Sequence, residues 1–79
     1  MNVFIEAMLG DIQRAVEFVE LYKENKNLLH LISAGEYSGK ALHHLFLAKE
    51  CESMSSEEYR EWEDIYWEFS GDLRIFTLN

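Results

Sequence analysis

The sequence contains no proline and only four glycines among its 79 residues. β-Sandwiches and barrels need many tight turns, and tight turns recruit these two residue types. Their scarcity argues against a turn-rich β fold and favours long helices joined by short loops. Disorder is also disfavoured, because 48% of the residues are hydrophobic and 14% are aromatic, far more than in chains that cannot form a core.

Cysteine and long apolar runs are scarce as well. Cys51 is the single cysteine, so no disulfide can form within the chain. No apolar stretch approaches the roughly 20 residues that a membrane-spanning helix requires. Residues 1–10 lack a basic segment and carry Glu6 inside their apolar run, unlike a secretory signal peptide. We therefore expect a cytoplasmic protein that does not bind membranes.

Basic residues are few, and the net charge of −8 is unevenly distributed. Residues 1–49 hold six acids and five bases, whereas residues 50–72 hold nine acids and a single base, Arg60. A negative field of this kind opposes direct binding to nucleic acid or anionic lipid. It favours a basic protein partner.

The length of the chain predicts a single helical domain over residues 1–79. A domain of this size buries only about 60% of the surface that its unfolded chain exposes. Such domains are marginally stable alone and often gain stability by oligomerising. We therefore expect a homo-oligomer, with a dimer as the simplest form.

The spacing of apolar residues predicts an all-α bundle of three long helices and one short helix, with no internal repeat. The first long helix is expected over residues 2–25, where apolar residues recur every three or four positions. Gly10 either kinks this helix or moves its start to Asp11, a good N-cap residue. A short helix is expected over residues 28–34, ended by Gly35.

A turn at residues 36–39 and a third helix over 38–51 are expected to follow. Ser55 and Glu58 have the spacing of a capping box, which predicts the start of a last helix. Its expected apolar face comprises Tyr59, Trp62, Ile65, Tyr66, Phe69 and Leu73. Because of Gly71, the residues that follow it are compatible with either helix or strand. We expect a helix whose last few residues are extended.

Residue patterns that carry chemistry are missing. His43 and His44 are adjacent, so on a helix they point about 100° apart and cannot readily share a metal ion. The thiol of Cys51 is flanked by acids, which weaken a nucleophile. We therefore predict no enzyme activity, no cofactor and no metal, and interpret His44 as a boundary histidine hydrogen-bonded to a neighbour.

The most informative surface is the charged side of the last helix. Trp67 lies there, off the apolar face, and is equally consistent with an interface anchor and with a single exposed apolar residue. Our leading hypothesis is a protein-binding module that inhibits or regulates a basic partner, in one version a nucleic-acid-binding protein whose groove the carboxylates occupy in place of phosphates. The expected binding residues are Glu57, Arg60, Glu61, Asp64, Trp67 and Glu68.

The alternative hypothesis is a homo-oligomeric structural or assembly protein without catalytic activity. Apolar residues that lie outside the predicted inner faces are the candidates for its subunit contacts. These residues are Phe18, Leu21, Leu47 and Ile75.

Overall fold

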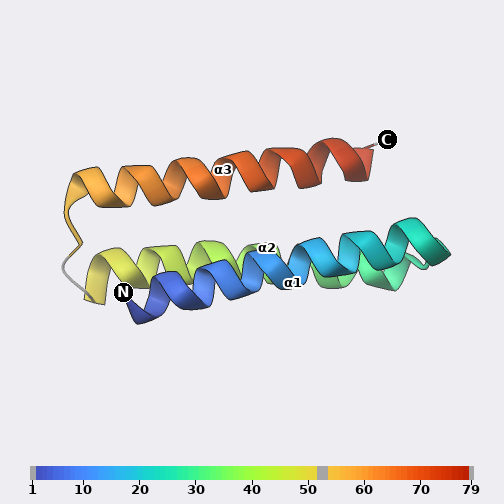
Figure 1. Cartoon of the computed structure of the whole chain (residues 1–79), viewed down its shortest axis with the longest axis horizontal. Helices are drawn as coiled ribbons and strands as arrows, with labels where there is room; N and C mark the ends of the chain where they lie inside the picture. Colours follow the sequence, from blue (N-terminus) through green and yellow to red (C-terminus); the bar gives the residue numbers. More distant parts are fainter. Residues whose placement is uncertain (1, 52–53, 79) are drawn as a thin grey trace.

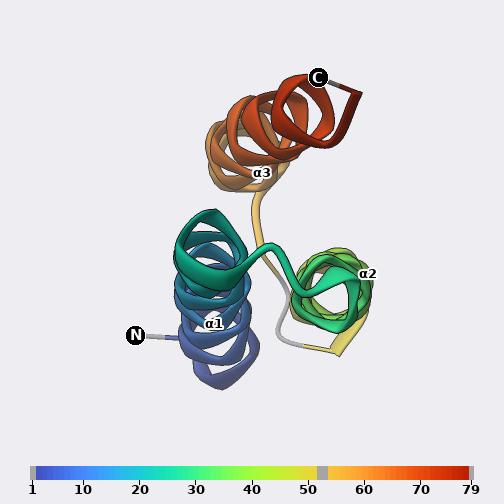
Figure 2. The same cartoon turned by 90° about the vertical axis from the view of Figure 1, so that its right-hand side faces the viewer.

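The computed structural model describes residues 2–51 and 54–78, with side chains described as far as Asp72. Within these residues the chain forms three helices, α1 (Val3–Asn25), α2 (Leu28–Cys51) and α3 (Ser56–Leu78), and no strand. Helices α1 and α2 form an antiparallel hairpin, and α3 runs alongside it (Figure 1). Viewed end-on, the three helices occupy the corners of a triangle (Figure 2). The predicted all-α bundle is therefore confirmed, but the described residues hold no fourth, short helix.

Helix α2 is continuous through Gly35 and Gly39, so the predicted break between residues 34 and 38 was wrong. Glycine costs about 1 kcal/mol against alanine in a helix interior, which is why its two occurrences resembled a turn. Neither glycine adopts a positive φ, so both fit an unbroken helix. The cost is offset by burial against α1 of the residues on either side, Ala34, Ser38 and Ala41.

The first helix matches its prediction closely. The side chain of Asn2 caps α1 by accepting hydrogen bonds from two backbone amides of the first turn, at 2.8 and 3.2 Å. The helix then passes through Gly10, so Asp11 lies inside it and is not its N-cap. Lys26 ends it in the left-handed conformation, and its backbone N–H donates to the carbonyl of Tyr22 at 2.7 Å.

Helix α3 begins where the capping box predicted. The hydroxyl of Ser55 accepts a hydrogen bond from the backbone N–H of Glu58 at 3.1 Å. The helix continues through Gly71 to Leu78, so the expected extended tail was wrong. Once a helix is nucleated, each further residue adds a hydrogen bond, and the described residues contain no strand with which an extended tail could pair.

The interface between α1 and α2 is lined by small side chains. Buried residues recur at intervals of four and three on α2 and at intervals of three, seven and four on α1, as in an antiparallel coiled coil. Small residues let two helix axes approach closely, and alanines from both helices are fully buried here. The buried set is Ile5, Met8, Ala15 and Val19 on α1 and Ala34, Ser38, Ala41, Leu45 and Ala48 on α2.

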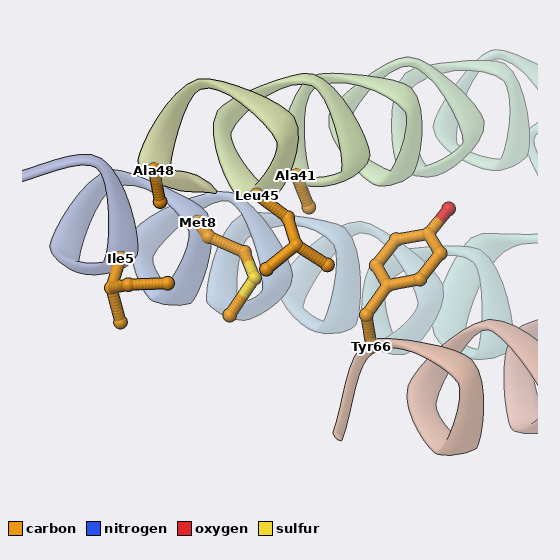
Figure 3. Close-up of a cluster of buried hydrophobic side chains, with 6 residues drawn as sticks. All are labelled: Ile5, Met8, Ala41, Leu45, Ala48 and Tyr66. Atoms are coloured by element: carbon orange, nitrogen blue, oxygen red, sulfur yellow. The ribbon is translucent and has the colours of Figure 1, made fainter. Parts of the chain in front are cut away.

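Helix α3 packs on this hairpin along a narrow strip centred on Tyr66, whose side chain is only 4% exposed. In Figure 3 the Tyr66 ring extends from α3 toward Leu45 and Ala41 of α2. Lys49 adds a cation–π contact, with its Nζ 4.5 Å from the centre of the Tyr59 ring. Ile65 was expected on this face but is 43% exposed, because its position next to Tyr66 turns it by about 100° around the helix.

The bundle is elongated rather than spherical. Its radius of gyration is 13.2 Å, against about 11.6 Å for a compact chain of this length. Its accessible surface is 5424 Å², against about 5,000 Å² for a protein of this mass. The molecule therefore exposes more surface than its size requires, and its candidate sites lie on that surface.

Candidate binding surfaces

The six residues predicted to bind a partner lie on one exposed side of α3, which we call the acidic face. Its residues are Glu57, Arg60, Glu61, Asp64, Trp67 and Glu68, and each is exposed. Four of them are carboxylates spaced four, three and four residues apart, which aligns them along the helix. The structure therefore brings the whole predicted set onto a single surface, pointing away from the strip that packs on the hairpin.

Among the described side chains, no ion pair within 4 Å involves a carboxylate of the acidic face, although the cation Arg60 lies on the same face. The ion pairs found among the described side chains join Arg14 to Glu17, Lys23 to Glu20 and His44 to Asp11, all within α1 or between α1 and α2. Helix α3 contains seven acids and two bases, for a formal charge of −5. Its outer surface is thus a row of exposed carboxylates in which Arg60 is the one base of the acidic face.

Trp67 is the large apolar side chain of the acidic face and is 55% exposed. Its ring meets the buried Tyr66 edge-on, with 5.1 Å between ring centroids and 74° between ring planes. Tyr66 is held in the core, so this contact restrains the indole while leaving much of it in solvent. A restrained, exposed tryptophan surrounded by charges can serve as an interface anchor.

A groove of about 470 Å³ lies between α1 and α3, and residues 12–23 of α1 and 68–72 of α3 line it. Its floor is apolar, formed by Ile12, Val16, Val19 and Phe69, and charged side chains stand at its rim. One rim residue, Glu68, also belongs to the acidic face. The groove and the acidic face are therefore adjacent parts of one surface.

The histidines and the cysteine do not form a reactive cluster. No group of three or more potential metal ligands occurs in the part of the chain that the structure describes. The rings of His43 and His44 lie 6.1 Å apart and are tilted by 52°, and Cys51 is exposed at the end of α2. The interpretation of His44 as a hydrogen-bonded boundary residue is confirmed by its contact with Asp11.

The residues predicted for self-association are not gathered on one surface. Phe18 is half-buried and stacks within the chain on His30 and Tyr37, at centroid distances of 6.0 and 5.8 Å. Leu21 and Leu47 lie near opposite ends of the antiparallel hairpin. The side chain of Ile75 lies outside the described residues. These positions therefore do not form a single patch.

Sequence reasoning missed a different set of apolar residues on the outer side of α2. Leu28, Ile32 and Phe46 are large side chains that are half or more exposed. They were overlooked because the helix was expected to break at Gly35, which separated Leu28 and Ile32 from Phe46. The repeat of three- and four-residue spacings, read through the glycines, would have revealed them.

Comparisons with protein-family models, curated proteins and solved structures found no match to this chain. Among the described residues, no helix is both long and apolar enough to cross a membrane.

Proposed function

We propose that this protein is a small protein-binding module that inhibits or regulates a basic protein partner through the acidic face of α3. The observation that carries this proposal is the row of exposed carboxylates at Glu57, Glu61, Asp64 and Glu68 beside the exposed ring of Trp67. A nucleic-acid-binding protein is the favoured partner, since aligned carboxylates can occupy a groove that otherwise holds phosphates.

Charge and the apolar anchor have separate roles in this mechanism. The field of α3 attracts a basic partner from a distance and raises the association rate, an effect that salt screens. Trp67 contributes after contact by burying a large ring that is already partly ordered by Tyr66. The adjacent groove offers an apolar recess for a side chain of the partner. Salt and the loss of Trp67 should therefore weaken binding in different ways.

The proposal is tested by capturing partners from host lysate with the full chain at low and high salt, followed by mass spectrometry. Trp67→Ala removes the anchor, and Ile65→Ala is its matched control, a half-exposed apolar residue of α3 outside the acidic face. Asp64→Asn with Glu68→Gln removes two charges of the face. Glu36→Gln is the control for charge, an exposed acid of α2.

We expect one dominant basic partner whose capture falls with Trp67→Ala, with the Asp64/Glu68 double variant and with salt. The two controls should capture it as the parent protein does. The proposal fails if the captured partner is not basic, or if binding is undiminished by strong salt and by loss of the face.

A second candidate function is a homo-oligomeric structural or assembly protein. It is favoured by the apolar side chains left exposed on α2, including Leu28 and Leu29. In that case the chain itself, rather than a basic protein, is the main species recovered from lysate. A chain that stays monomeric at high micromolar concentration would exclude this function.

A further inference from the structure

Six residues form an uncharged row along the outer side of α2, which we call the α2 stripe. They are Leu28, Ile32, Gly35, Gly39, Leu42 and Phe46, spaced four, three, four, three and four residues apart. This is the heptad spacing by which one helix packs along another. From its first to its last residue the row spans 18 residue steps, which is about 27 Å along the helix axis.

The stripe is largely open to solvent. Leu28, Ile32 and Phe46 are 65%, 57% and 50% exposed, and both glycines are exposed between them. Only Leu42 is half-buried, where it also contacts the core. The large exposed side chains thus lie at the two ends of the stripe, with the glycines and Leu42 between them. Isolated apolar residues on a surface are ordinary, but several on one side of a helix are typical of an interaction site.

The fold of the single chain does not explain the two glycines of the stripe. Neither has a positive φ, and a Cβ built on either would meet nothing within 4 Å, as is also true of Gly10 and Gly71. The stripe differs in holding two such glycines four residues apart on one side of a helix. Alanine would therefore fit both positions and favour the helix. A second helix that crosses α2 here gives them a role, because glycine at a crossing point lets the axes approach most closely.

The formal charges of the three helices indicate which kind of partner packs against the stripe. Helix α2 carries two acids and two bases, whereas α1 has a formal charge of −3 and α3 of −5. Two copies can therefore meet through α2 without bringing like charges together, which contact through α3 would not allow. A basic partner would be attracted to α3 and not to α2. The neutral, apolar surface of α2 can instead pack against the same surface of a second copy of the chain.

We propose that the α2 stripe is the contact surface between two copies of this chain. Two α2 helices cross at Gly35 and Gly39, and the large side chains of each stripe pack against the other copy in a two-fold symmetric contact. The stripe is about 27 Å long and about 10 Å wide, so it buries less than the roughly 800 Å² per partner of a typical stable interface. The dimer is accordingly weak, with a Kd in the micromolar range.

The test is sedimentation equilibrium of the full chain from low to high micromolar concentration. We expect a reversible monomer–dimer equilibrium that Ile32→Glu abolishes, since it places a charge in the contact. Leu21→Glu introduces the same charge at an exposed leucine of α1 and should leave the dimer intact. A strictly monomeric parent protein, or a dimer lost with Leu21→Glu but not with Ile32→Glu, overturns the proposal.

Glycine substitutions give a second test, in which the dimer weakens while the monomer becomes more stable. A misfolded variant would not give this combination. Gly39→Ala should stabilise the monomer against urea yet raise the dimer Kd about tenfold or more, because added volume at a close contact is poorly tolerated. Gly10→Ala, at an equally open helical position of α1, should stabilise the monomer and leave the Kd unchanged. An unchanged Kd in Gly39→Ala places the crossing elsewhere and overturns the proposal.

Salt separates this inference from the function proposed for α3. Contact through the neutral α2 stripe should be insensitive to salt, whereas capture of a basic partner through the acidic face should weaken. Dimerisation that salt reverses would contradict the α2 contact. Failure to find a basic partner would leave the dimer prediction standing, because the two surfaces share no residue.

Discussion

Nδ1 of His44 on α2 lies 2.5 Å from Oδ2 of Asp11 on α1, a hydrogen bond between residues 33 positions apart in the chain. An ionised carboxylate can only accept, so Nδ1 carries the hydrogen. The His44 ring also stacks on Phe4, with 6.4 Å between ring centroids. This polar contact, partly buried at the edge of a mostly apolar interface, joins the two helices of the hairpin in one register.

Replacing His44 by alanine should destabilise the fold by about 1.5–3 kcal/mol, the range for a hydrogen bond to a charged group. The loss arises because Asp11 stays partly buried without its partner. Urea unfolding followed by circular dichroism would measure it. His43→Ala removes the exposed neighbouring histidine and should change stability by less than about 0.5 kcal/mol. Equal effects of the two substitutions would contradict a specific role for the hydrogen bond.

Enlarging the alanines between α1 and α2 should be costly. Ala41 is fully buried where the helices approach, so Ala41→Leu should destabilise the protein by about 1–3 kcal/mol through overpacking. Ala7→Leu enlarges a partly buried alanine of α1 and should have a smaller effect. Thermal unfolding of the two variants gives the comparison, and tolerance of leucine at position 41 would show that the axes are not held close.

Removing the N-cap of α3 should loosen that helix. Ser55→Ala deletes the hydroxyl that accepts from the backbone N–H of Glu58 and should cost about 1 kcal/mol. Ser56→Ala changes the next, exposed serine, the first residue of α3, and serves as the control. Amide hydrogen exchange in the first turn of α3 would report the difference, and equal exchange in both variants would argue against capping by Ser55.

Stability should depend on Tyr59 at alkaline pH. Burial raises the pKa of its phenol above the ordinary value, and the charge and hydrogen bond of Glu63 act in the same direction. The folded chain then holds this proton more tightly than the unfolded chain. The free energy of unfolding is therefore unaffected by Tyr59 below about pH 10 and falls as the pH rises through that value.

The substitution Tyr59→Phe removes this titration. Comparison of urea unfolding at about pH 9 and about pH 11 should show a smaller loss of stability in the variant than in the parent protein. Absorbance of tyrosinate during alkaline titration provides a direct readout of the same group. Identical pH dependence in the two proteins would contradict the raised pKa.

Local signals in the sequence located most helix ends. The first helix was predicted within a residue of its observed bounds, and the cap at Ser55 was placed correctly. Both depend on residues within one turn of each other, so a short stretch of chain contains the whole interaction. The glycines were wrongly predicted to end helices, because that prediction also considered only a short stretch of chain. Taken locally, Gly35 and Gly71 resemble helix ends, yet both lie within helices.

The candidate surfaces were only partly predictable. The acidic face follows from spacing along one helix, and the structure places all six of its predicted residues together and exposed. The groove between α1 and α3 could not be predicted, because it depends on how two helices distant in sequence sit side by side. The α2 stripe was missed because it spans the supposed break.

The sequence by itself determined that this protein is helical, where two of its helices begin, and which side of α3 is charged. These properties depend on neighbours within a few residues of each other. Tertiary structure alone decided that α2 continues through its glycines and that α3 packs along the narrow strip centred on Tyr66. It also decided which apolar residues stay in solvent, because burial against a distant segment has a free energy that no local stretch of sequence contains.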